Sequence, residues 1–310
     1  MPLLRAGSGI VTFRLVSLNT PSQSRSDDRV VTLVAVHGNG GGAHRFARVV
    51  PLMPADVSLA AVTLPGFAAV PSDPALRSLA DFAGCLARLV EPLPRPRIIL
   101  GHGIGGSIAL ELVQRHADLV DGLILHAPVG TRLDRRIFPK LMAIPGARSL
   151  GRRLFASRLL RPIVRRMLFS RTVPAHYLDR FFEEYRQCSA FSQMFDLITP
   201  AWFQGLRPTE LSSALLWGED ERLLSVDQLT DYQALLPCAV TRRVPGWGHF
   251  PMIERPEEYA AEIASLARSL ISPAADASGS TDQDEPASPL PLAGAVGMWG
   301  PMVGLMGAGG

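Results

Sequence analysis

The chain has 310 residues, of which 47% are hydrophobic and 19% charged, and its formal net charge is +3. This composition suits a folded domain with a sizeable core and excludes a disordered chain, while the small net charge gives no indication of a nucleic-acid partner. The three cysteines are scattered, with the spacing of neither a zinc site nor a disulfide framework. Because no signal-peptide pattern is visible either, we expect a cytoplasmic protein with reduced thiols.

Short apolar runs alternate with helix-length segments along most of the chain. This alternation is typical of an α/β fold in which helices cover both faces of a mostly parallel central sheet. Several runs are rich in Val, Ile and Leu without alternation, as expected for strands buried on both faces. The expected strands are residues 11–16, 31–36, 59–64, 98–101, 122–126, 214–217 and 239–244.

The pattern changes between residues 131 and 205, where helical periodicity replaces the strands. We expect residues 1–130 and 206–272 to form the α/β core and residues 131–205 to form a helical, arginine-rich cap. Within the cap, residues 154–168 alternate apolar and arginine side chains at helical spacing, and Pro162 is expected to kink or divide that helix. Such a basic amphipathic helix can contact an anionic membrane or simply cover a core with its charged face in water.

The last part of the chain, residues 273–310, is acidic at first and then apolar with many Gly and Pro residues. The acidic part is typical of a flexible linker, and the helix-breaking residues argue against a membrane span in the apolar part. We therefore predict a disordered tail, with a peripheral membrane or protein contact through the tail or the basic cap as a possible role.

A glycine-rich turn follows the expected strand at 98–101. The sequence Gly101-His102-Gly103-Ile104-Gly105 resembles the nucleophile elbow of the α/β-hydrolase family, which is normally written G-x-S-x-G. In this frame Gly103 stands at the nucleophile position, where it offers no attacking side chain.

Three further segments are similar to loops of the same family, in the expected order. The run from His37 to Gly42 resembles the oxyanion-hole loop, and the resemblance implies that the backbone N–H groups of Asn39 and Ile104 receive negative charge. The segment Trp217-Gly218-Glu219-Asp220-Glu221 resembles the acid loop, with Glu221 at the acid position and Asp220 as a possible substitute. The segment from Pro245 to Pro251 resembles the loop of the catalytic histidine, His249, and a helix is expected at 256–269.

The glycines at 101, 103 and 106 also match a dinucleotide-binding fingerprint. That motif requires an acidic residue about twenty positions further on to hold a ribose, and residues 123–128 contain none. We therefore expect no cofactor, and the spacing of the cysteines gives no reason to expect a metal.

The resemblance implies a hydrolase-type site without its usual nucleophile. One hypothesis is a divergent hydrolase or lyase in which Glu221 orients His249 as a general base on a small apolar or acyl substrate. A catalytically inactive binding or scaffold protein, and an inactivated form of an ordinary serine esterase, remain as alternatives. A loop at 64–70 supports them, because Ala68 and Val70 stand where this family commonly has glycine and serine.

Overall fold

The computed structural model describes residues 30–135, 140, 141, 144, 146–148, 150, 157, 159, 161–169 and 171–272. The expected strand at 11–16 and the predicted tail at 273–310 lie outside the described residues, as does most of the segment between 151 and 160.

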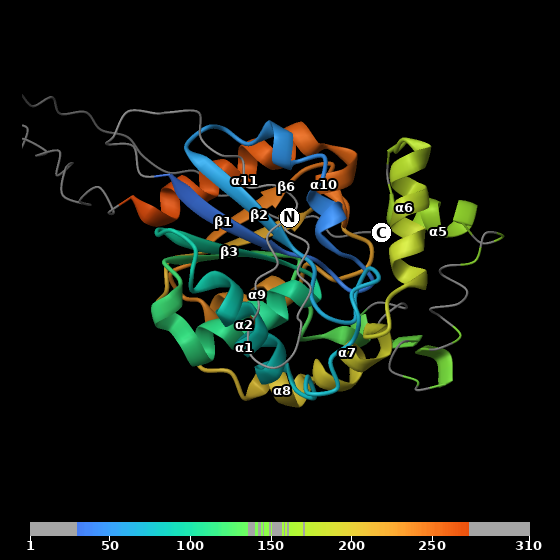
Figure 1. The fold of residues 1–310 in the computed structure, drawn as a ribbon, viewed down its shortest axis with the longest axis horizontal. Helices are drawn as coiled ribbons and strands as arrows, with labels where there is room; N and C mark the ends of the chain where they lie inside the picture. The colour runs from blue at the N-terminus through green and yellow to red at the C-terminus, as the bar shows by residue number, and fades with distance from the viewer. Residues whose placement is uncertain are drawn as a thin grey trace, which may run out of the picture. The chain divides into compact units, whose positions relative to one another are not determined.

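A six-stranded parallel sheet forms the centre of the described chain, in the order β2-β1-β3-β4-β5-β6 (Figure 1). Each pair of neighbouring strands is parallel. The strands are β1 (Val31–Val36), β2 (Val57–Val62), β3 (Arg97–His102), β4 (Gly122–His126), β5 (Ser213–Gly218) and β6 (Val240–Val244).

The sequence prediction of an α/β fold is confirmed. The strands expected at 31–36 and 122–126 have the observed bounds, and those at 98–101, 214–217 and 239–244 each differ by a single residue at one or both ends. The strand expected at 59–64 begins two residues earlier, at Val57, and ends at Val62. Thr63 and Leu64 follow the strand and are also buried. Their local sequence pattern therefore resembles that of the strand although neither residue belongs to it.

Helices cover both faces of the sheet (Figure 1). One face carries α1 (Leu79–Val90), α2 (Ile104–His116) and α9 (Gln228–Leu235), and α1 packs against α2. The other face carries α11 (Pro256–Ile271), which contacts β1, β4 and β5 and is preceded by the short α10 (Pro251–Glu254). The helix expected at 256–269 is therefore present and two residues longer.

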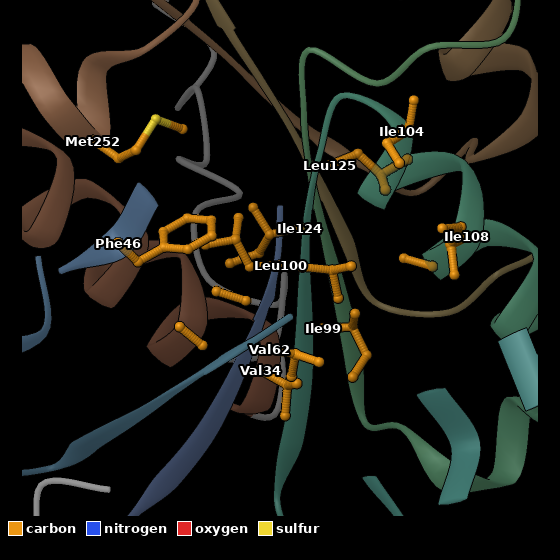
Figure 2. Close-up of a cluster of buried hydrophobic side chains, with 14 of the residues drawn as sticks. Val34, Phe46, Val62, Ile99, Leu100, Ile104, Ile108, Ile124, Leu125 and Met252 are labelled. Carbon is orange, nitrogen blue, oxygen red and sulfur yellow. The ribbon is translucent and has the colours of Figure 1, made fainter. Parts of the chain in front are cut away.

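Apolar side chains fill the space on both sides of the sheet. Figure 2 shows Phe46 and Met252 on one side and Ile104 and Ile108 on the other, and all four are buried. Burying a side chain of this size stabilises the fold by about 1.5–3 kcal/mol. This two-sided burial holds the carboxyl ends of the strands in fixed positions.

Between β4 and β5 the described residues form helices and no strand. These are α5 (Arg161–Leu168), α6 (Ala175–Arg186), α7 (Phe191–Leu197) and α8 (Pro200–Gln204), together with the short 3-10 helix η4 (Leu133–Arg135). Pro162 lies in the first turn of α5, where a missing N–H removes no helical hydrogen bond. The predicted kink or division at Pro162 also involves the segment before Arg161, most of which lies outside the described residues, so it stays a prediction.

No helix in the described part of the chain combines the length and the apolar composition that a membrane crossing requires.

Candidate active site

The candidate site lies where the order of the strands in the sheet reverses. After β1 the chain passes to β2 on one side, and it then returns to form β3 on the other side of β1. Val36 at the end of β1 pairs with Gly101 near the end of β3, so the loops after these two strands start side by side. In α/β sheets, such a switch point at the carboxyl ends of the strands is where ligands bind.

The turn from β3 into α2 is tight. Gly103 lies between His102, the last residue of β3, and Ile104, the first residue of α2, with φ = 56°. A Cβ atom on Gly105 would lie 2.4 Å from the carbonyl oxygen of Val36, so the elbow needs glycine there to approach β1. A Cβ atom on Gly103 would lie 3.4 Å from Gly38 Cα, which is an ordinary contact. Space therefore permits a side chain at position 103, and only the positive φ favours glycine.

His249 and Glu221 form a buried hydrogen-bonded pair. The distance between His249 Nδ1 and Glu221 Oε2 is 2.6 Å, and both residues are buried. The second carboxylate oxygen of Glu221 accepts hydrogen bonds from the N–H groups of Leu223 (2.6 Å) and Leu224 (3.2 Å). With Nδ1 donating to Glu221, the other ring nitrogen, Nε2, is left to exchange protons with a ligand.

Asp220 has a different position from Glu221. Its side chain is exposed, and its backbone N–H donates to the carbonyl oxygen of Trp247 (2.9 Å). This backbone bond joins the loop after β5 to the loop that carries His249, and Glu221 is the carboxylate that reaches the imidazole.

The loop after β1 supplies the second predicted element of the site. Asn39 lines the same cavity as Gly103 and His249, and its side-chain amide donates to the carbonyl oxygen of Phe191 in α7 (3.1 Å). Ile104 begins α2, and N–H groups in the first turn of a helix have no intrahelical acceptor. Asn39 and Ile104 thus line one cavity with Gly103, and the role that the resemblance implies for their N–H groups stays a prediction.

His37 fixes this loop and has no access to a ligand. Its Nδ1–H donates to the carbonyl oxygen of Gly38 (2.9 Å), and its Nε2 accepts from the N–H of Leu64 (3.2 Å). Burial lowers the pKa of His37 to about 4, with the nearby Arg45 cation acting in the same direction. Both ring nitrogens are therefore occupied by the backbone in a neutral imidazole.

His102 supports His249 and was missed by sequence reasoning. Its Nε2–H donates to the carbonyl oxygen of His249 (3.0 Å), and the two ring centroids are 4.6 Å apart. Burial lowers the pKa of His102 well below its ordinary value, so the ring is neutral. Its position directly before Gly103 was the available signal, but no spacing rule connects it to residue 249.

A partly open cavity lies beside these groups. It has a volume of about 490 Å³, and Gly103, Ile104, Asn39 and His249 are among the residues that line it. Most of its remaining wall is apolar and comes from the helices between β4 and β5. These wall residues include Phe191, Met194, Phe195 and Ile198, with Leu223 and Leu224 from the acid loop.

A buried ion pair connects this wall to the loop after β1. Arg45 Nε lies 3.2 Å from Glu184 Oε2 of α6, and both side chains are almost completely buried. The Arg45 guanidinium carbon also lies 3.5 Å from the centre of the Phe181 ring. Sequence reasoning missed this pair because the two residues belong to segments far apart in the chain.

The fold and the site together have the architecture of an α/β hydrolase. A sequence model of the alpha/beta hydrolase family matches residues 33–262, and the chain therefore belongs to this family. Membership supports enzyme activity, as the sequence prediction favoured.

Two relatives are pimeloyl-[acyl-carrier protein] methyl ester esterases. The protein from Neisseria meningitidis serogroup B is 32% identical over 131 residues, which are 42% of this chain and 48% of that protein. This match thus spans about half the length of that relative. The protein from Edwardsiella ictaluri is 28% identical over 251 residues, covering 76% of this chain and 92% of the relative.

A solved structure shows the same fold. The putative lipase from Acinetobacter baumannii superimposes with a TM-score of 0.64 at 20% identity, covering 84% of this chain and 91% of that chain.

Proposed function

We propose that this protein is a divergent hydrolase that cleaves a small acyl ester without a covalent enzyme intermediate. Glu221 orients His249, and His249 acts as the general base on a water molecule above Gly103. The backbone N–H groups of Asn39 and Ile104 receive the negative charge that develops on the substrate carbonyl oxygen.

The proposed reaction needs no nucleophilic side chain. His249 Nε2 takes a proton from water while the water oxygen bonds to the acyl carbon. The bond between that carbon and the alcohol oxygen then breaks, and the proton passes from His249 to the leaving oxygen. Without a serine nucleophile such a site is slow, because an intact oxyanion hole and substrate binding retain only about 10³–10⁴ over the reaction in water.

One observation carries the proposal. The hydrogen bond of 2.6 Å between His249 and Glu221 is buried, and His249 lines one cavity together with Gly103, Asn39 and Ile104. A protein that only bound a ligand would gain nothing from a buried carboxylate that orients an imidazole toward the cavity.

The cavity favours an apolar acyl group in the substrate. Its walls are formed mainly by Phe, Met, Leu and Ile side chains, which bind hydrocarbon by removing it from water. The two relatives are both named methyl ester esterases, which agrees with an acyl ester as the substrate class of this chain.

The test is hydrolysis of short p-nitrophenyl esters by the His249→Ala variant. Removing a general base lowers kcat/KM by about 10²- to 10⁴-fold. Asp220→Ala is the matched control, because Asp220 is the neighbouring carboxylate with an exposed side chain, and we expect its activity to be unchanged. Turnover that persists unaltered in His249→Ala would contradict the role of His249.

A binding or scaffold protein is the second candidate. It is favoured by Gly103 and by the loop after β2, where Ala68 and Ala69 have positive φ values of 42° and 65° at non-glycine positions. This candidate predicts that the unaltered protein hydrolyses no ester above the rate of the buffer and still binds an acyl ligand in the cavity.

A further inference from the structure

Exposed apolar side chains gather in one segment of the helical insertion. Among the residues that the structure describes, the large hydrophobic side chains with high exposure number seven, and five of them lie between 141 and 163. The most exposed are Leu159, at 88%, and Ile163, at 66%. The other three in this segment are Leu141, Ile144 and Leu150.

The most exposed side chains lie at and just before the start of α5. Ile163 is in the first turn of α5, beside the exposed Pro162, and Leu159 precedes the helix by two residues. The opposite side of α5 packs inward, since Val164 and Leu168 are buried. The helix therefore already has a buried apolar face, and the exposed Ile163 adds a second apolar surface that faces water.

The segment that carries these side chains is basic in sequence. Residues 135–178 contain eleven Arg and Lys residues and no Asp or Glu. Exposed cations among them are Arg135, Lys140, Arg165, Arg166 and Arg171. Arg148 and Arg161 pair with Asp196 and Asp179 from later helices. A solvated surface helix normally mixes both signs of charge, so this excess of cations favours an anionic partner.

The same segment reaches the cavity. Lys140 and Arg148 both line it, together with Asp134. Arg148 also forms an ion pair with Asp196 and lies over the Phe195 ring. The basic segment therefore connects the protein surface to the cavity wall.

We propose that this surface, defined by Leu141, Ile144, Leu150, Leu159 and Ile163 with Lys140, Arg165 and Arg166, binds an anionic lipid bilayer. Its apolar side chains enter the boundary between headgroups and acyl chains, and the cations contact the lipid phosphates. An anionic bilayer fits better than an acidic protein patch, because a segment that exposes both aliphatic side chains and cations matches a layer that is charged outside and apolar just beneath.

The test is co-sedimentation of the full chain with vesicles. We expect binding to phosphatidylcholine vesicles that contain about one-third phosphatidylglycerol, little binding to pure phosphatidylcholine, and weaker binding in about 0.5 M salt. The double variant Leu159→Asp/Ile163→Asp should reduce the partition coefficient at least about tenfold, because it places two anions at the membrane contact. Arg165→Gln/Arg166→Gln should reduce it by a similar factor.

The matched control is Leu52→Asp/Val240→Asp, which changes the two other exposed hydrophobic residues, at 40% and 39% exposure. This control should bind the anionic vesicles as the unaltered chain does, and circular dichroism should show that all variants fold. Unaltered binding by Leu159→Asp/Ile163→Asp would overturn the proposal. Absence of binding by the unaltered chain would also overturn the proposal. An acidic protein would then be the better candidate partner for the basic surface.

Discussion

Gly103 combines a conformation that favours glycine with space for a larger residue. The positive φ of 56° is one that side-chain-bearing residues adopt at a cost of about 1–3 kcal/mol. The space above it is open, since a Cβ atom would meet only Gly38 Cα, at 3.4 Å. The elbow therefore has the shape for a nucleophile, and the identity of one residue decides which chemistry it supports.

The Gly103→Ser variant tests whether the rest of the site is arranged for nucleophilic attack. We expect this variant to react covalently with a fluorophosphonate probe, because the new hydroxyl would lie in the cavity that His249 lines. Intact-protein mass spectrometry would measure the labelling, and the double variant Gly103→Ser/His249→Ala should label much more slowly.

Gly103→Ala is the control for backbone strain. It carries the same positive φ without a hydroxyl, so both variants should lose about 1–3 kcal/mol of unfolding free energy and only the serine variant should label. A serine variant that folds and stays unlabelled would contradict the proposed arrangement of the site.

At the scale of elements, the buried ion pair joins the helix α6 to the loop after β1. Arg45 lies in the 3-10 helix η1 (Ala43–Phe46) and Glu184 in α6. Burial raises the pKa of Glu184 and lowers the pKa of Arg45, and the attraction between the two charges opposes both shifts. Each charge therefore depends on the other to remain ionised away from water, which couples the two elements.

Glu184→Ala should destabilise the protein by about 3–5 kcal/mol, because it leaves the Arg45 cation buried without its partner. Urea unfolding, followed by circular dichroism, would measure the loss. Asp179→Ala is the matched control from the same helix, because it breaks the more exposed pair with Arg161. We expect it to cost less than about 1 kcal/mol.

Replacing both partners separates the pair from the packing around it. The double variant Arg45→Met/Glu184→Met should recover most of the stability that Glu184→Ala loses, since apolar side chains of similar volume often substitute for a buried pair. Equal losses in the Asp179 and Glu184 variants would show that the buried pair does not join these elements.

At the scale of the whole molecule, three buried histidines lie at the carboxyl ends of adjacent strands. His37 follows β1, while His102 and His126 end β3 and β4. Burial lowers the pKa of His37 to about 4 and that of His126 to about 3, and it also lowers the pKa of His102. All three are therefore neutral in the folded protein at pH values where the unfolded chain begins to protonate them.

The free energy of unfolding should consequently fall as the pH drops below about 6.5. Below that value the unfolded chain binds more protons than the folded protein, and each histidine contributes up to about 1.4 kcal/mol per pH unit until its folded pKa is reached. Urea unfolding between pH 7.5 and 5 would measure this slope. His126→Gln should reduce the slope, and His176→Gln, at an exposed position, should leave it unchanged.

The sequence alone was sufficient to determine the α/β fold, all six described strands of the sheet to within two residues, and the chain order of the loops that follow them. A strand that is buried on both faces has a local signature, a run of mostly apolar residues without alternation, as in Val31–Val36. Tight turns have one too, because they need closely spaced glycines.

Only the tertiary structure decided which side chains meet. It paired His249 with Glu221 and left the adjacent Asp220 exposed. It placed His102 against the His249 loop and Arg45 against Glu184. These contacts depend on how separate loops and helices pack at the ends of the strands. Sequence periodicity predicts helices and strands, but it does not predict contacts between distant segments. The local sequence around each partner gives no information about the other partner.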